Sequence, residues 1–282
     1  MLGFINIYKP AGITSNAVVQ KVKKKFNIKK IGHMGTLDPM ACGLLPIAIG
    51  KASRLFDYSL DKVKRYNVIY EFGHITDTLD ATGNIIQDNM QIPSKDNILK
   101  EIRTFIGKSM QVPPKFSANH VNGRRAYDLA REGVEFELKP KEIKIFEFKL
   151  LEKINETSYK FTIVCSSGTY IRSIGRDLAD KLNSGATMTY LERCENGFFN
   201  LDNCVKFEDL LNGNIEDFLI SPIDVFQKFD IININKKQCK DLLDGKKINV
   251  NVRNNSFIIC DNNLIGIAKP NEYLKLDTYL GE

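Results

Sequence analysis

Apolar residues recur along the chain either in short runs or at helical spacing, and Gly, Pro, Asn and Asp separate the segments. Runs rich in β-branched and aromatic residues predict strands, because such side chains fit a buried or half-buried sheet. The predicted strands cover residues 4–8, 44–49, 65–72, 143–151, 159–165 and 187–194. Helical spacing after capping hydroxyls predicts helices over residues 18–26, 94–106 and part of 166–182, with shorter ones at 51–56 and 126–132.

The pattern changes towards the C-terminus. From about residue 231 the chain is rich in Asn and Lys, with short apolar runs and one helical segment near residues 237–243 that is followed by Gly245. This texture predicts a small β-rich domain with a single helix. A length of 282 residues with 43% apolar residues fits two domains, or one large domain with an appendage.

The composition of the chain indicates in which cellular compartment the protein works. No apolar run approaches the ~18 residues of a membrane-spanning helix, and the first residues lack the pattern of a secretory signal. The six cysteines form no C-x-x-C pair. We therefore expect a cytoplasmic protein with free thiols, neither exported nor bound to a membrane, and without a zinc site or disulfide framework.

The net charge of +6 is unevenly distributed. The first 75 residues contain twelve Lys and Arg against four acidic residues, whereas the remainder is slightly acidic. A basic region of this kind is a candidate surface for nucleic-acid phosphates. A solvated lysine-rich helix face would give the same count, so charge alone leaves both interpretations open.

The stretch GHMGTLDPMACGLL, residues 32–45, combines His33 and Asp38 with several turn-forming residues and leads into a buried strand. Pro39 biases Asp38 away from helical conformation, so that the loop can hold its carboxylate in a fixed direction. Taken alone, the same pattern is also typical of a structural turn. The choice between the two depends on the rest of the chain.

Several reaction classes lack support. The three histidines have no metal-ligand spacing, and there is neither a G-x-S-x-G nor a G-x-G-x-x-G motif. Asp77 and Asp80 do not follow the calcium-loop pattern and are interpreted as turn acids. A single carboxylate, tyrosines, an arginine and a basic surface suit a reaction on a nucleotide that is extruded from a larger nucleic acid.

Two later segments supply those groups. Residues 166–182 predict a helix capped by Ser167 or Thr169, and Tyr170 and Arg172 can both enter a cleft from its irregular first turn. Residues 111–133 form a basic insertion rich in turn signals, which could lie on an acidic partner or be a plain surface hairpin.

Five segments in order carry a resemblance to a known family. They are KPAGITS, GHMGTLDPMACGLL, KRYNVIYEFGHITDTLDATG, QVPPKFSANHVNGRRAYDLAREG and SSGTYIRSIGRDL, followed by YLER. Together they closely resemble the TruB family of transfer-RNA pseudouridine synthases, over about residues 3–210. The tail segments LLDGKKINV and LIGIAK resemble, more weakly, the small PUA-type RNA-binding domain of bacterial members.

The resemblance implies an α+β fold with a mixed, mainly antiparallel central sheet and flanking helices. It implies a catalytic domain over residues 1–228, an RNA-clasping insertion at about 110–140, and a PUA-like domain over 229–282. By the same resemblance Asp38 is the catalytic carboxylate, and no metal or organic cofactor is needed. The implied substrate-binding residues are His33, Tyr66, Tyr170, Arg172 and Leu191: Tyr66 stacks on the flipped base, Arg172 pairs with Asp38, and His33 fills the space that flipped nucleotides vacate.

The implied partner is the T stem-loop of transfer RNA, with uridine 55 as the target of a monomeric enzyme that requires no protein partner. His120 stands where many family members carry Lys, which puts one phosphate contact in the insertion in doubt. Two alternatives remain: an RNA-binding or transfer-RNA-folding protein without turnover, and a guide-dependent synthase acting on other RNAs. The shortness of the chain disfavours the second.

Overall fold

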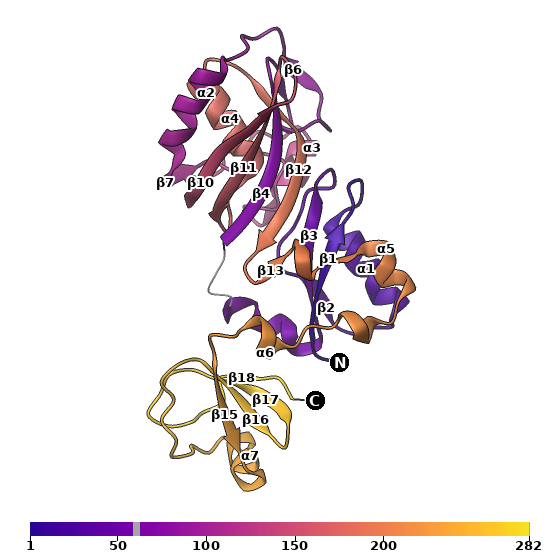
Figure 1. The fold of residues 1–282 in the computed structure, drawn as a ribbon, viewed down its shortest axis with the longest axis vertical. Coiled ribbons are helices and arrows are strands. Elements are labelled where there is room, and N and C mark those ends of the chain that lie inside the picture. The colour runs from indigo at the N-terminus through magenta and orange to yellow at the C-terminus, as the bar shows by residue number, and fades with distance from the viewer. Residues whose placement is uncertain (59–62, 282) are drawn as a thin grey trace.

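A large mixed sheet organises the computed structural model, which describes residues 1–58 and 63–281. Its strand order is β14-β1-β3-β12-β4-β11-β10-β7, with β2 added to β3 and β13 to β12. Among the described strands of this sheet, the β1–β14 and β3–β12 pairs are parallel and all other pairs are antiparallel. The strands are β1 (Gly3–Lys9), β2 (Ile31–His33), β3 (Cys42–Ile49), β4 (Val63–Phe72), β7 (Gly107–Gln111), β10 (Lys141–Lys153), β11 (Ser158–Ser166), β12 (Ala186–Asn196), β13 (Phe199–Asn200) and β14 (Val205–Lys206). The expected α+β class with a mixed, mainly antiparallel sheet is confirmed (Figure 1).

Strand β12 joins the two halves of this sheet. It pairs in parallel with the start of β3 and antiparallel with β4 along most of its length. Gly43 makes the first contact possible: its φ is +97°, and a Cβ there would collide with the backbone of Arg193. The loop before β3 is thereby placed beside β4 and β12.

Helices cover one face of the upper half of the sheet (Figure 1). The described helices are α1 (Ser15–Lys25), α2 (Lys95–Ile102), α3 (Ala126–Arg131), α4 (Ile171–Lys181), α5 (Phe207–Asn212), α6 (Pro222–Val225) and α7 (Lys236–Leu243), with 3-10 turns η1 (Gly50–Tyr58), η2 (Arg103–Phe105), η3 (Leu201–Asn203) and η4 (Ile215–Phe218). Helices α2 and α4 pack over β10 and β12, on a core of buried aliphatic and aromatic side chains. Burying such side chains stabilises the fold by about 1.5–3 kcal/mol each.

Helix caps follow the sequence in two cases and depart from it in a third. The side chains of Thr14 and Ser94 accept hydrogen bonds from the first turns of α1 and α2. The cap expected from Ser167 or Thr169 is wrong: α4 begins after Tyr170, which has extended backbone and no side-chain capping bond. The predicted helix over 94–106 is α-helical to Ile102 and continues as the 3-10 turn η2 to Phe105, after which Ile106 is extended and half exposed.

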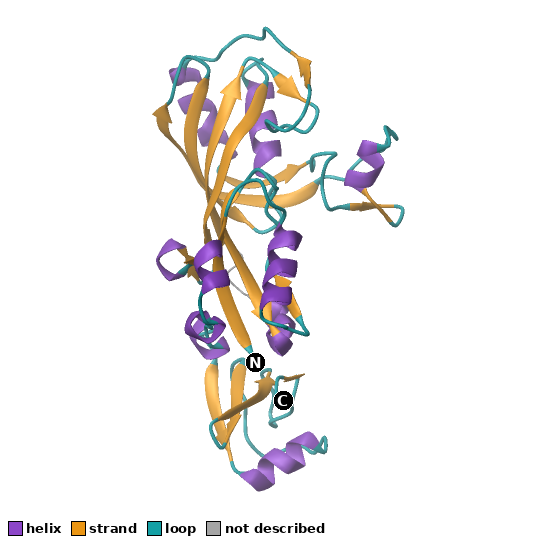
Figure 2. Cartoon of the chain, turned by 90° about the vertical axis from the view of Figure 1, so that its right-hand side faces the viewer, coloured by secondary structure: helices purple, strands orange, loops and turns teal. Residues whose placement is uncertain are grey.

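Two small hairpins lie outside the large sheet, one in the insertion at about residues 110–140 and one around the loop of residues 76–86. Strands β8 (His120–Val121) and β9 (Arg124–Arg125) pair with each other and lead into α3, and the unit projects from the body of the molecule (Figure 2). Strands β5 (Ile75–Thr76) and β6 (Ile85–Gln87) flank the predicted turn-rich loop.

The C-terminal region has its own sheet of β15 (Asp230–Ile234), β16 (Ser256–Cys260), β17 (Asn263–Ala268) and β18 (Thr278–Tyr279). Helix α7 follows β15, as the sequence pattern predicts. This small sheet packs against η1 through an aromatic cluster that includes Phe226, Phe229 and Phe257. Arg54 Nη1 also donates to the Tyr279 carbonyl at 2.9 Å. Within the described ranges no helix is long and apolar enough to cross a membrane. All six cysteines are free thiols.

Candidate active site

Two fully buried cations hold the loop between β2 and β3. The first is Arg193 of β12, whose guanidinium donates to three backbone carbonyls of this loop and of β3. Its acceptors are Leu44 O (2.8 Å), Gly35 O (3.0 Å) and Thr36 O (3.4 Å). The fork geometry of Arg suits such a set of converging carbonyls, so Arg193 fixes the path of the loop.

The second cation is Lys9 at the end of β1. Its Nζ donates to Ile13 O at 2.7 Å and to Pro39 O at 3.3 Å. Nearby, the Ser15 hydroxyl exchanges hydrogen bonds with both the N–H and the carbonyl of Leu37. The segment KPAGITS therefore serves as the support of the loop that carries Asp38.

The burial of Lys9 predicts a pH-dependent stability. Burial lowers its pKa from 10.5 to about 8, so the unfolded chain binds this proton more tightly than the folded one, and the free energy of unfolding should rise as the pH is raised above 8. Between pH 8 and 9.5 the rise is at most about 2 kcal/mol for one lysine. Urea unfolding at the two pH values checks it.

The pKa of Lys64 is also lowered to about 8, so Lys64 contributes its own increase in the free energy of unfolding over this pH range. Lys9→Met should therefore remove only part of the rise, whereas Lys153→Met, at an exposed lysine, should leave it whole. An unchanged rise in Lys9→Met would contradict this account of Lys9.

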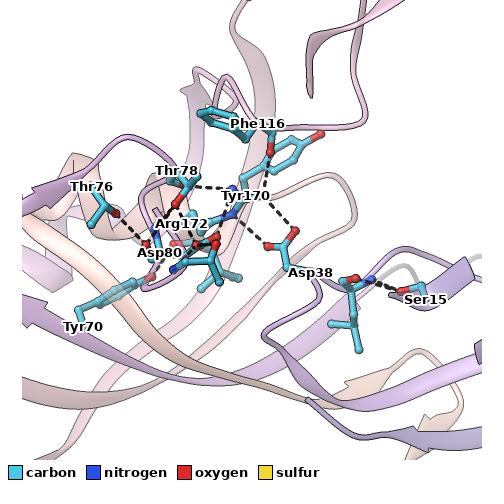
Figure 3. Close-up of polar contacts among 12 residues, drawn as sticks. Ser15, Asp38, Tyr70, Thr76, Thr78, Asp80, Phe116, Tyr170 and Arg172 are labelled. Atoms are coloured by element: carbon cyan, nitrogen blue, oxygen red, sulfur yellow. Dashed lines mark hydrogen bonds and ion pairs between the residues drawn. The ribbon is translucent and has the colours of Figure 1, made fainter. Parts of the chain in front are cut away.

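Asp38 forms a two-point ion pair with Arg172 (Figure 3). Arg172 Nε lies 3.0 Å from one carboxylate oxygen and Nη2 lies 3.0 Å from the other. The Arg172 side chain is 6% exposed and that of Asp38 is 30% exposed. A pair of this geometry fixes the carboxylate rotamer and leaves one edge of Asp38 open to a substrate.

Arg172 also contacts three groups from other segments. Its Nη1 donates to Thr78 O at 3.0 Å and lies 3.5 Å from an oxygen of Asp80, while Nη2 donates to Phe116 O at 3.0 Å. The other oxygen of the buried Asp80 accepts from the Thr82 N–H and the Thr78 hydroxyl. Asp80 is thus a turn acid, as the sequence predicts, and in addition a second partner of Arg172.

Opposing effects set the pKa of Asp38. Burial raises it above its ordinary value, and the Asp80 carboxylate raises it further. Arg172, and more weakly Lys9, act in the opposite direction. The carboxylate is therefore partly desolvated, which strengthens it as a nucleophile or base, and it depends on Arg172 to remain ionised.

The first turn of α4 brings Tyr170 and Arg172 to the same place. Tyr170 is extended and Arg172 is helical, so side chains that would diverge on a regular helix can converge. Gly175 lets α4 lie on the ring of Tyr70, whose hydroxyl donates to Ile171 O at 2.6 Å. Strand β4 thereby positions the start of α4.

A cavity of about 250 Å³, here called the reaction cavity, opens at this point. Five of the six site residues named from the sequence line it: Asp38, Tyr66, Tyr170, Arg172 and Leu191. Burial raises the pKa of Tyr66 and of Tyr170, so both phenols are protonated at neutral pH. The cavity thus joins one carboxylate and two neutral phenols with an apolar wall.

The structure places His33 elsewhere. It lines a neighbouring cavity of about 430 Å³, here called the His33 cavity, with Phe56, Phe198 and Asn196. Its buried Nδ1 has no hydrogen-bond partner among the described residues. Burial lowers its pKa, so the ring is neutral at neutral pH. His33 is not among the described residues that line the reaction cavity, and its non-catalytic role stays a prediction.

Comparison with known proteins decides the family. The model of the TruB family pseudouridylate synthase (N terminal domain) matches residues 23–171. A "tRNA pseudouridine synthase B" of Clostridium novyi (strain NT) is 42% identical over 248 residues, which cover 88% of this chain and 86% of that protein. The protein of the same name from Clostridium tetani (strain Massachusetts / E88) is 36% identical, over 100% of this chain and 94% of that one.

The chain belongs to the TruB family. The loop of residues 34–41 lies within the match to the family model, and α4 and β12 lie within the match to the Clostridium tetani relative, which covers the whole chain. Two solved structures share the fold over 98% of this TruB family chain. One is an H/ACA ribonucleoprotein bound to a substrate RNA containing 2'-deoxyuridine, with TM-score 0.69, 21% identity and 84% of that chain covered. The other is a Cbf5-Nop10-Gar1 complex, with TM-score 0.67, 23% identity and 79% covered.

Sequence reasoning missed three side chains of this TruB family site. Asp80 and Arg193 contact the pair and the loop, and Lys64 lines both cavities. Lys64 and Tyr66 are two residues apart on one strand, so strand periodicity placed Lys64 on the face of Tyr66 and could have identified it. The pattern offered no comparable signal for Asp80, which reaches Arg172 from a distant loop.

Proposed function

We propose that this chain isomerises uridine to pseudouridine in transfer RNA, at position 55 of the T loop, with Asp38 as the catalytic carboxylate. The observation that carries the proposal is the two-point ion pair of Asp38 and Arg172 at the wall of a small, partly apolar cavity. The names of the Clostridium relatives support transfer RNA as the substrate.

The reaction that suits this cavity requires no oxidant and no net hydrolysis. The bond between base N1 and ribose C1′ breaks, a bond between C5 and C1′ forms, C5 loses a proton and N1 gains one. Asp38 attacks the ribose or the base, or acts as a base, during this exchange. The bound RNA completes the enclosure of this small cavity, which keeps the detached base close to the sugar, and Leu191 supplies an apolar wall against water.

The other site residues bind and orient the uridine. Tyr66 stacks on the extruded base, and stacking of about 1–3 kcal/mol offsets part of the cost of flipping it out. Tyr170 contacts the base from the start of α4. His33 occupies, from the adjoining cavity, the space that the extruded nucleotides leave.

The projecting insertion is the proposed clasp for the RNA stem. Phe116 O contacts Arg172, and the Gln111 side chain bonds both backbone groups of Tyr170. When RNA docks on the basic hairpin of β8 and β9, these contacts can therefore transmit a shift of the insertion to Arg172 and Tyr170 in the reaction cavity. The four-stranded C-terminal sheet is proposed as a PUA-like second RNA contact.

The test is release of tritium from C5 of labelled uridine in a T stem-loop, because C5 loses its proton only on isomerisation. We expect release from uridine 55 by the chain alone, with no guide RNA or protein partner, and none when that uridine is cytidine. Tight binding without release would favour the RNA-folding alternative. Release that requires a guide RNA would favour the guide-dependent alternative.

A further inference from the structure

Lys64 stands on the wall between the two cavities. It lies two residues before Tyr66 on β4, so its side chain projects on the same face of the sheet. Lys64 lines the reaction cavity together with Asp38 and also lines the His33 cavity. A single ammonium group therefore faces both hollows.

This ammonium has no counter-ion in the described part of the chain. Lys64 takes part in no ion pair with any described residue, and Asp38, the carboxylate that shares its cavity, is paired with Arg172 instead. Burial, with the charge of Arg193 second, lowers the pKa of Lys64 to about 8. The fold thus holds a partly desolvated cation without compensation, which is costly unless a ligand supplies the charge.

Arg193 lies behind the same spot. A Cβ placed on Gly35 would be 3.4 Å from Lys64 Nζ and 3.7 Å from Arg193 Nη1, so both cations approach the same point of the loop. Arg193 is fully buried and, among the described residues, bonds to carbonyls rather than to a carboxylate. Two adjacent cations of this kind make the wall between the cavities electropositive.

We propose that Lys64, with Arg193 behind it, forms a phosphate subsite that binds one of the two phosphodiesters flanking the target nucleoside. The inference rests on the proposed function, since the ligand is the RNA strand that brings its uridine into the reaction cavity. A strand with one nucleotide in that cavity and the next directed towards the His33 cavity must carry a phosphodiester past Lys64 Nζ. Its charge compensates the ammonium, and Lys64 returns towards its ordinary pKa.

The experiment scans the stem-loop RNA with single methylphosphonate linkages, which replace a charged phosphate oxygen by a methyl group. Binding to the full chain is measured by fluorescence anisotropy for wild type, Lys64→Met and Lys64→Arg. Lys153→Met is the matched control, because it removes the same charge from the far end of the sheet. Circular dichroism and thermal unfolding show whether each variant is folded.

We expect Lys64→Met to weaken binding of the unmodified RNA about tenfold to hundredfold, as for loss of a charge-assisted hydrogen bond. Lys64→Arg should retain most of the affinity, and Lys153→Met all of it. A methylphosphonate at one of the two flanking linkages should weaken RNA binding by the wild type by a similar factor and should not change RNA binding by Lys64→Met. Linkages elsewhere should affect both proteins equally.

The proposal is overturned if neither flanking methylphosphonate weakens wild-type binding, a result that requires no variant to fold. It is also overturned if the flanking linkage weakens Lys64→Met as much as wild type. Tritium release by the wild type tests the reaction separately. A scan that singles out one linkage without any release would reject the proposed reaction and retain the phosphate subsite.

Discussion

Asp38→Asn is expected to abolish pseudouridine formation, by roughly 10³-fold or more, without loss of RNA binding. The amide has the same shape, so the loop supported by Lys9, Ser15 and Arg193 should keep its path. It lacks the negative oxygen that attacks or takes a proton, and it pairs with Arg172 only as a neutral acceptor. Single-turnover tritium release, with anisotropy for binding, measures both quantities.

Asp77→Asn is the matched control. It makes the same chemical change three residues before Asp80, at a carboxylate oxygen that accepts the Asn84 N–H at 3.0 Å. It should react as wild type does. Release by Asp38→Asn at the wild-type rate would show that Asp38 is not the catalytic carboxylate.

The pH profile of the wild type gives a second result on the same group. Only the ionised carboxylate is active, so activity is present above the pKa of Asp38 and is lost as the pH falls through it. Because burial raises this pKa, the loss should begin at a higher pH than for an exposed aspartate. RNA binding followed over the same range separates this loss from general acid effects.

The sequence predicted those parts of the fold that depend on local pattern. The run over residues 44–49 is buried at every position, as a continuous apolar run indicates. Strands 65–72, 143–151, 159–165 and 187–194 all lie in the sheet, because alternation and β-branching report burial directly.

What pattern could not supply is which strands become neighbours. The parallel contact of β12 with β3 depends on Gly43 meeting the backbone of Arg193, 150 positions later in the chain. In the sequence, Arg193 looks like any other charged residue of a strand, because only the contact between β12 and β3 buries it. The same holds for Asp80: its position in a turn-rich segment predicts a turn residue and gives no sign of its ion pair with Arg172.

Five of the six site residues line one cavity, but they reach it from two kinds of position. Tyr66 and Leu191 lie within strands β4 and β12, whereas the other three lie where elements begin or end. Asp38 and Tyr170 are in irregular backbone next to regular elements, and such junctions point side chains into clefts. His33 belongs to the same loop segment but is in strand β2, whose pairing with β3 directs it to the other cavity.

The second large effect is expected for Arg172→Ala, which should lower the free energy of unfolding by about 3–5 kcal/mol and abolish turnover. Without the guanidinium, Asp38 and the buried Asp80 are left as two like charges with no cation between them. The pKa of Asp38 must then rise further, since Arg172 is the main group that lowers it. Urea unfolding and single-turnover tritium release measure the two losses.

Arg172→Lys tests whether charge alone is enough. An ammonium is a single point, whereas the guanidinium contacts both oxygens of Asp38 together with Asp80 and two carbonyls. We therefore expect the lysine variant to recover part of the stability and little of the turnover. Wild-type turnover in Arg172→Lys would mean that the two-point geometry is not needed.

The double variant Arg172→Ala with Asp80→Asn separates a structural from a catalytic role. Neutralising Asp80 removes one of the two unpaired charges, so stability should recover by more than Asp80→Asn changes it alone, a coupling that a double-mutant cycle quantifies. Turnover should not recover, because Asp38 still lacks the partner that keeps it ionised and orients it. If turnover returned with stability, Arg172 would act only as the counter-ion of buried acids. The ion pair that carries the proposed function would then be a support of the fold.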